Sequence, residues 1–187
     1  MFTPTCGPTH FLIGVSIEVP EPYSTRLYEA RRDAGDPLAD HIPPHITVLG
    51  PTAVTTRDVP AINQHLDAVT AAIPAFDVHL RGTGSFRPIS PVVFVEVVEG
   101  AEQCEQVEAA TRRGPLAQVQ RFPYHPHVTI GHEIAEAALD RAFTDMADFD
   151  ARFNVPALWL YICDDNGVWR KKRRFALRGG QSASTVD

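Results

Sequence analysis

The sequence lacks the roughly 18–20 consecutive apolar residues that a membrane-spanning helix needs. Its longest apolar candidate, residues 155–163, has the length of a strand. The N-terminus has no basic stretch ahead of an apolar one, which argues against a secretory signal. Three cysteines lie far apart and without Cys-x-x-Cys spacing. These absences favour a reduced, cytoplasmic setting without a disulfide framework and without a membrane partner.

An excess of positive charge is also lacking. The 187 residues carry a formal net charge of −6, which argues against a broad surface for long nucleic acid. Residues 170–174 (RKKRR) are the exception, and they fit either a solvated strand or a local nucleic-acid contact. The hydrophobic fraction of 44% is ordinary for a globular protein of one domain or two small lobes.

Two tetrapeptides stand out, residues 45–48 (HITV) and 127–130 (HVTI). Each reads His-x-Thr-apolar, and each directly follows a proline, Pro44 or Pro126. The alternation predicts strands with one buried and one polar face. Residues two apart on a strand share a face, so each motif should present an imidazole beside a hydroxyl. Two such pairs suit the chemistry of phosphate esters.

Apolar periodicity and turn residues predict the remaining elements. The expected strands cover residues 11–19, 45–49, 76–81, 92–98, 127–130, 157–163 and 170–177. The expected helices cover residues 22–34, 58–72, 102–112 and 135–146. Gly50-Pro51 should end the first motif strand, and residues 82–84 should form a turn.

The order of these elements repeats. The two motif histidines are 82 positions apart, and the strands that precede them are separated by nearly the same interval. The repeat predicts a single bilobal domain over residues 1–178, with units of about 10–90 and 91–178 related by a pseudo-twofold axis. That symmetry would bring the motifs together at a central cleft. The small and polar tail, residues 179–187, is expected to be disordered.

The paired motifs resemble those of the two-histidine (2H) phosphoesterase superfamily, also called the 2′-5′ RNA ligase family. Residues 82–86 (GTGSF) before 92–95 (VVFV) resemble its glycine-phenylalanine turn and strand, and residues 122–131 are similar to its second motif strand. The resemblance spans about residues 10–178. It implies an α+β fold of two similar lobes, each with antiparallel sheet and helices. It also implies action on 2′,5′ or 2′,3′-cyclic phosphodiesters without a metal. Val48 and Ile130 stand where many members have leucine, which weakens assignment to a subfamily.

Hydrolysis of a cyclic phosphodiester needs a base for water and an acid for the leaving oxygen. Histidine suits both roles, because its ordinary pKa of about 6.5 lies near working pH. The hypothesis is that His45 and His127 are catalytic and that Thr47 and Thr129 bind the phosphate oxygens. Which histidine is the acid stays open at this point.

Other side chains are candidates for substrate contacts. Aromatic rings could stack on a base, and each could equally belong to the core. These candidates are Phe86, Tyr124 and Trp169, with His125 beside the second motif, and Arg81, Arg87 and Arg121 for phosphate or ribose. His125 and His127 could also form a metal pair with His41, Asp40 or His132, but no tight ligand cluster is visible, so neither metal nor cofactor is expected.

The sequence therefore predicts a metal-independent phosphodiesterase that opens 2′,3′-cyclic phosphates of RNA ends or small nucleotides to a monophosphate. By the family resemblance, the product would be the 2′-phosphate. One alternative is cleavage or ligation of 2′,5′-linked RNA or oligoadenylate. Another is a module that binds nucleotide or RNA without turnover. The expected partner is a small nucleotide or RNA terminus, and a monomer is favoured.

Overall fold

The computed structural model describes residues 10–179. Cys6 and all of the predicted tail except Gly179 lie outside these residues. The strands are β1 (His10–Glu18), β2 (His45–Thr55), β3 (Phe76–Ser85), β4 (Val92–Glu99), β5 (His127–His132), β6 (Asp150–Val155), β7 (Ala157–Cys163) and β8 (Trp169–Ala176). The helices are α1 (Tyr23–Asp33), α2 (Val59–Ala72), α3 (Ala101–Thr111) and α4 (Glu136–Asp145), with a short 3₁₀ helix η1 (Gly114–Leu116).

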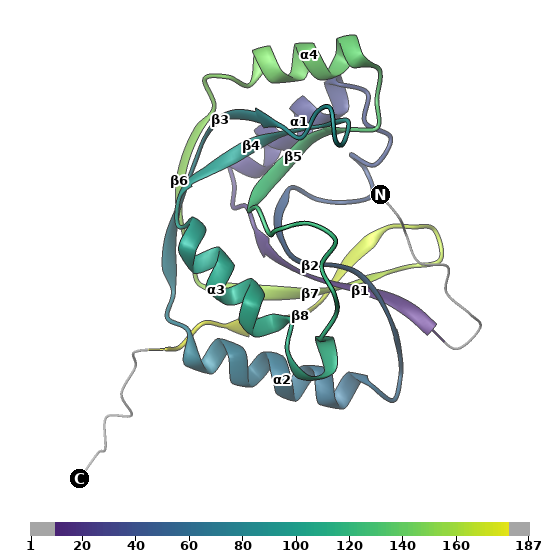
Figure 1. Cartoon of the computed structure of the whole chain (residues 1–187), viewed down its shortest axis with the longest axis vertical. Coiled ribbons are helices and arrows are strands. Elements are labelled where there is room, and N and C mark those ends of the chain that lie inside the picture. The colour runs from purple at the N-terminus through teal and green to yellow at the C-terminus, as the bar shows by residue number, and fades with distance from the viewer. Residues whose placement is uncertain (1–9, 180–187) are drawn as a thin grey trace.

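The strands form two four-stranded antiparallel sheets, ordered β2-β1-β7-β8 and β5-β4-β3-β6. Helices α2 and α3 pack against the first sheet, and α1 and α4 pack against the second (Figure 1). The predicted α+β fold of two similar lobes is confirmed. No helix within residues 10–179 is long and apolar enough to cross a membrane.

The two lobes exchange segments. Helix α1 follows a strand of the first sheet but contacts β5 of the second, and α3 follows β4 but contacts β2. Strand β3 joins the second sheet, whereas β7 and β8 complete the first. The sheets are therefore not the consecutive units 10–90 and 91–178. This exchange ties the lobes into one folding unit, because each sheet is covered by one helix from each half of the chain.

Two predicted strand ends are wrong. Strand β2 continues past Gly50-Pro51 to Thr55, and β3 continues through the expected turn at 82–84 to Ser85. β2 is an edge strand, where a proline need not interrupt a ladder on the free side. Gly82 has a φ of +68° within an irregular stretch of the β3–β4 ladder. The glycine therefore bends the strand rather than ending it.

The sequence reasoning also missed β6. Its residues alternate between exposed polar side chains and more buried apolar ones, as a half-buried strand should. Asp150, Arg152 and Asn154 make the segment polar overall, which hid the alternation. Pairing with β3 completes the second sheet.

Both motif strands are anchored by the core. Ile46, Val48, Val128 and Ile130 are at most 1% exposed, and the histidines and threonines between them are half-buried. The predicted alternation is thus confirmed in both strands. Burial of each aliphatic side chain contributes about 1.5–3 kcal/mol, so packing on one face fixes the polar side chains on the other.

Gly100 offers a test of the packing between β3 and the turn that leads into α3. It precedes α3 with a φ of +86°, and a Cβ there would lie 2.5 Å from the Asp77 carbonyl oxygen. Gly35 has a similar φ of +80° but no atom within 4 Å of such a Cβ. Gly35→Ala should lose only the roughly 1–2 kcal/mol of left-handed backbone strain. Gly100→Ala should lose about 1–3 kcal/mol more because of overpacking. Urea denaturation measures both, and equal losses would contradict the clash.

Candidate active site

The two motifs lie on edge strands that meet. β2 is at one edge of the first sheet, β5 is at one edge of the second, and the two strands contact each other. The charge of His45 contributes to lowering the pKa of His127, so both imidazoles share one electrostatic environment. The structure therefore brings together residues that are 82 positions apart in the sequence.

Each motif strand is irregular at the same point. Thr47 pairs with Ser16 of β1, and Thr129 pairs with Phe94 of β4. The residue after each threonine, Val48 in β2 and Ile130 in β5, has no partner of its own in the neighbouring strand. Such bulges bend a strand and redirect its side chains, and they are common beside active sites. The twofold relation between the motifs thus extends to the pairing of their strands.

The two imidazoles are oriented by equivalent hydrogen bonds. Nδ1–H of His45 donates to the Pro43 carbonyl at 2.7 Å, and Nδ1–H of His127 donates to the His125 carbonyl at 2.7 Å. A carbonyl only accepts, so Nδ1 carries the proton in both rings. In the neutral rings Nε2 is therefore the atom that can accept a hydrogen bond.

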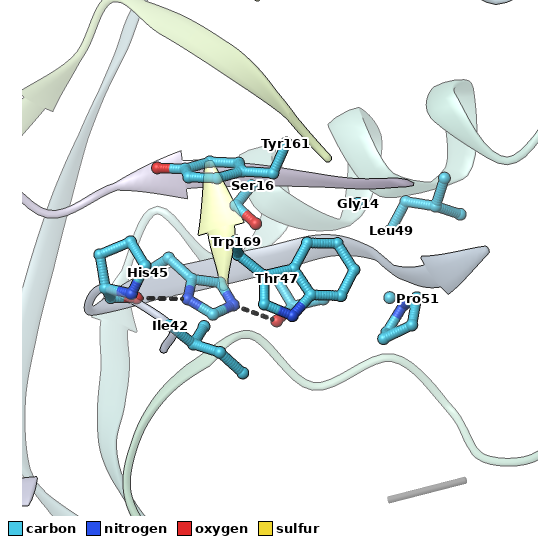
Figure 2. Close-up of a pocket in the computed structure, with 11 residues that line it drawn as sticks. Gly14, Ser16, Ile42, His45, Thr47, Leu49, Pro51, Tyr161 and Trp169 are labelled. Carbon is cyan, nitrogen blue, oxygen red and sulfur yellow. Dashed lines mark hydrogen bonds between the residues drawn. The ribbon is translucent and has the colours of Figure 1, made fainter. Parts of the chain in front are cut away.

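The threonines complete the two motifs. The hydroxyl of Thr47 lies 3.0 Å from Nε2 of His45 and donates to it in the neutral ring (Figure 2). Thr129 holds the corresponding position on β5, two residues after His127, with the same half-buried character. Each motif therefore presents one imidazole and one hydroxyl from a single strand face.

Burial controls the charge of both histidines. Desolvation lowers the pKa of His45, and the buried Arg31 lowers it further. Desolvation lowers the pKa of His127 to about 4, and the carbonyl of His125 only partly opposes this. The neutral form of His127 therefore dominates at neutral pH, and neutral imidazole is the form that accepts a proton from water.

Arg31 also supports the segment that orients His45. Its side chain is buried, pairs with Asp36 at 2.9 Å and donates to the Ile42 carbonyl at 3.1 Å. These bonds fasten α1 to the residues just before Pro43, whose carbonyl holds the His45 ring. The guanidinium of Arg31 is thus bonded within the protein. It affects the site by holding the segment before His45 in place and by its positive charge, which lowers the pKa of His45.

A pocket opens beside His45 and Thr47. Trp169 and Tyr161 form part of its wall, and Figure 2 shows the Trp169 indole beside Thr47. A Cβ on Gly14 would lie 3.1 Å from the Trp169 ring, so glycine lets the indole approach the sheet. The other lining residues are Ser16, Ile42, Pro43, Leu49, Gly50 and Pro51.

The second lobe fills the equivalent space. Phe94 pairs with Thr129 in the place that Ser16 takes opposite Thr47. The Phe86 and Phe94 rings are 4.4 Å apart, and each is 5.0 Å from the His127 ring. His127 is therefore enclosed by aromatic rings, whereas His45 faces an open pocket.

Two further predicted residues lie around the second motif. The Tyr124 hydroxyl donates to the Thr47 carbonyl at 2.8 Å. This bond links the segment just before β5 to β2. Its half-buried ring packs against the core, and burial raises its pKa. His125 is exposed, with its ring 5.5 Å from Phe86. The geometry favours a positioning role for Tyr124 over base stacking.

The candidate arginines are engaged elsewhere. Arg87 pairs with Asp140 at 2.8 Å and also bonds Glu136, and Arg121 lies over the Phe122 ring. Arg81 is largely exposed and is 3.9 Å from Asp150. In the basic run, Arg170 pairs with Asp164, Lys171 with Glu18, and Arg173 with Asp67. Most of this run thus consists of surface ion pairs on β8.

His125 and His127, the pair considered as metal ligands, have ring centres 6.2 Å apart. Within residues 10–179, no three His, Cys, Asp or Glu side chains are grouped as metal ligands. The backbone N–H of Trp169 donates to the backbone carbonyl of His41 at 2.9 Å. This bond holds the start of β8 against the segment before His45.

Several pocket residues were missed from the sequence. Gly14 and Ser16 are small residues inside a strongly apolar strand, and this contrast was the available signal. Tyr161 gave no such signal, because an aromatic residue in a buried strand is ordinary.

The comparison with protein families agrees with this geometry. The model of the 2′-5′ RNA ligase superfamily matches residues 19–167. The chain belongs to this superfamily. A relative from Bacillus cereus (strain AH820), provisionally named a phosphoesterase, is 26% identical over 151 residues, which cover 79% of this chain and 86% of the relative.

Solved structures of other proteins share the fold of this chain. Escherichia coli LigT complexed with 3′-AMP aligns with a TM-score of 0.63 at 18% identity, covering 90% of this chain and 98% of LigT. TT0787 of Thermus thermophilus aligns with a TM-score of 0.61 at 19% identity, covering 90% of this chain and 99% of that protein. At these identities the likeness concerns the fold.

The desolvation of the His127 imidazole predicts a pH dependence of stability. Its pKa falls from 6.5 to about 4 on folding, so between these values the unfolded chain binds a proton that the folded protein does not. The contribution is fully present above pH 6.5 and is lost as the pH falls toward about 4. His127→Gln should therefore flatten the decline in unfolding free energy over this window, as followed by urea denaturation. An unchanged slope in the variant would contradict the assignment.

Proposed function

We propose that this superfamily member hydrolyses 2′,3′-cyclic phosphates to a monophosphate by acid–base catalysis between His45 and His127. The observation that carries the proposal is the pair of equivalent Nδ1–carbonyl bonds, which leave both Nε2 atoms available on adjoining strands. The phosphoesterase relative and the LigT complex with 3′-AMP are consistent with a phosphoester substrate that carries a nucleoside. No metal or cofactor is required in this scheme.

The threonines would stabilise the charge that develops on phosphorus. Their hydroxyls lie on the same strand faces as the imidazoles, so they could donate to the two non-bridging oxygens. Thr47 would exchange its present bond to His45 for a bond to the phosphate. Donors placed in advance at developing charge lower the barrier without reorganisation.

The unequal walls of the site favour one assignment of roles. The open pocket lies beside His45, so the ribose and base would lie on that side of the phosphorus. The leaving ribose oxygen would then be nearest His45, and the attacking water would approach in line from His127. Neutral His127 would take a proton from the water molecule while the water oxygen bonds to phosphorus. The P–O3′ bond would break, and protonated His45 would donate its proton to O3′. The product is the 2′-phosphate.

Trp169 would hold the base in this scheme. Its indole forms a wall of the pocket, and stacking of a base on an aromatic ring contributes about 1–3 kcal/mol. Phe86 and His125 would instead support His127. The Phe86 ring packs against the His127 ring, and the His125 carbonyl orients the His127 imidazole.

Cleavage or ligation of a 2′,5′ phosphodiester is the second candidate, because the matching family is described by that linkage. The same two imidazoles would serve it, since acid and base exchange roles in the reverse direction. Binding without turnover is less consistent with the site, because it would not require two oriented imidazoles.

Substitution of either histidine tests the mechanism. His45→Ala and His127→Ala should each lower kcat for a 2′,3′-cyclic nucleotide by about a hundredfold or more, because each removes one proton transfer. Product analysis on a panel of 2′,3′-cyclic nucleotides, cyclic-ended RNA and 2′,5′-oligoadenylate distinguishes the candidate functions. The assay is run with and without a chelator.

His65→Gln is the matched control. His65 lies on α2 and hydrogen-bonds the Thr111 carbonyl at 3.0 Å, outside the pocket, so its loss should leave turnover near that of the wild type. Near-wild-type turnover in either motif variant would contradict the mechanism. Loss of turnover on chelation that added metal restores would also contradict it.

The pH profile tests the protonation states. Burial lowers the pKa of both catalytic histidines below 6.5, and activity needs one neutral and one protonated ring. The singly protonated free enzyme is therefore most abundant below pH 6.5, and kcat/KM should peak there and fall as pH rises. The optimum of kcat should lie higher, because the bound anion raises the pKa of His45. A kcat/KM that keeps rising into alkaline solution would contradict these states.

A further inference from the structure

The floor of the pocket beside His45 is a trough along β1. Gly14 and Ser16 are two positions apart on that strand, so they share its pocket face. Thr47 of β2 pairs with Ser16 on one side of this trough. Tyr161 of β7 pairs with Gly14 on the other side. Because glycine and serine are small, space remains above β1 between the two flanking strands.

The hydroxyl of Tyr161 lacks a partner in the part of the chain that the structure describes. Tyr161 is only 4% exposed, and it lines the pocket. No hydrogen bond joins its hydroxyl to any residue within 10–179. Burial raises the pKa of this hydroxyl, and the Glu18 carboxylate raises it further, so the proton is retained at neutral pH. A pocket therefore contains a donor without an acceptor, whereas buried polar groups are normally paired.

This phenolic hydroxyl points toward the His45 end of the pocket. Figure 2 shows it at the end of the ring that faces away from Gly14 and Leu49. The influence of Glu18 agrees with this direction, since Glu18 pairs with His45 between β1 and β2. The Trp169 indole lies toward the other end, close to Gly14. The pocket thus has an aromatic end and a hydroxyl end.

The shape of a cyclic nucleotide decides which of its atoms would reach the hydroxyl end. In a nucleoside 2′,3′-cyclic phosphate the base is attached at C1′ and the 5′ carbon at C4′, on opposite sides of the cyclic phosphate. With the phosphate between the two histidines and the base against Trp169, the 5′ oxygen would be directed away from the indole. That oxygen can accept a hydrogen bond, which the Tyr161 hydroxyl can donate.

We propose that Tyr161 is a specificity-determining residue, whose hydroxyl donates a hydrogen bond to the 5′ oxygen of the ribose. This inference rests on the proposed function and adds a residue that recognises the nucleoside rather than the phosphate. The contact is remote from the bonds that form and break, so it stabilises the bound substrate and the transition state alike. Its loss should therefore raise KM and leave kcat nearly unchanged.

Removal of either partner of this hydrogen bond tests the inference. Tyr161→Phe should lower kcat/KM for adenosine 2′,3′-cyclic phosphate by about two- to tenfold, the range expected for one neutral hydrogen bond. The 5′-deoxy analogue lacks the acceptor, so the wild-type enzyme should turn it over with a similarly reduced kcat/KM. Tyr161→Phe should not distinguish the two compounds, because the bond is already absent in the variant.

Tyr23→Phe is the matched control, because the half-buried Tyr23 ring packs against Phe153 outside the pocket. It should leave kcat/KM unchanged for both compounds. Neither variant should shift the midpoint of urea denaturation, since no hydrogen bond within residues 10–179 is lost. A lower midpoint in Tyr161→Phe would show that its hydroxyl is bonded within the protein and would count against the inference.

The kinetic outcomes separate the inference from the proposed function. An equal loss on both compounds in Tyr161→Phe, a loss confined to kcat, or no loss on either compound overturns the inference and leaves the proposed function standing. The same follows if the variant still prefers the compound with the 5′ hydroxyl. Absence of turnover of both compounds by the wild-type enzyme overturns the proposed function, and the inference with it.

Discussion

The contact between two edge strands is the constraint on which the site depends. β2 and β5 each end a sheet, and they meet where the sheets adjoin. Because each strand buries its aliphatic residues on one face, its histidine and threonine are held on the other. The exchange of α1 and α3 between lobes secures this contact, since each helix packs on the motif strand of the opposite sheet.

The two motifs have equivalent geometry, whereas the walls around them differ. The bulge after each threonine and the carbonyl bound to each Nδ1 are the same in both motifs. The neighbouring strands differ, because Ser16 leaves space beside His45 and Phe94 removes it beside His127. A repeat of this kind supplies two similar imidazoles, and differences between the flanking residues give them different surroundings.

Local patterns predicted the elements that local forces determine. The alternation in both motifs predicted the strands and their faces. The repeat predicted two lobes, but not which strands each sheet contains. The bulges and the one-sided pocket depend on which residue lies opposite each threonine, and a single strand's sequence does not contain that pairing. β6 was hidden by its charged side chains, and the role of Tyr124 depended on a contact with Thr47 from a distant part of the chain.

The proposed roles all require one phosphate between the two motifs. A crystal structure of the protein with a nucleoside 2′-monophosphate, the expected product, tests this requirement directly. The account predicts phosphate oxygens within hydrogen-bonding distance of Nε2 of both His45 and His127, with the base against Trp169. A phosphate bound to one histidine alone, or lying away from both, would contradict it.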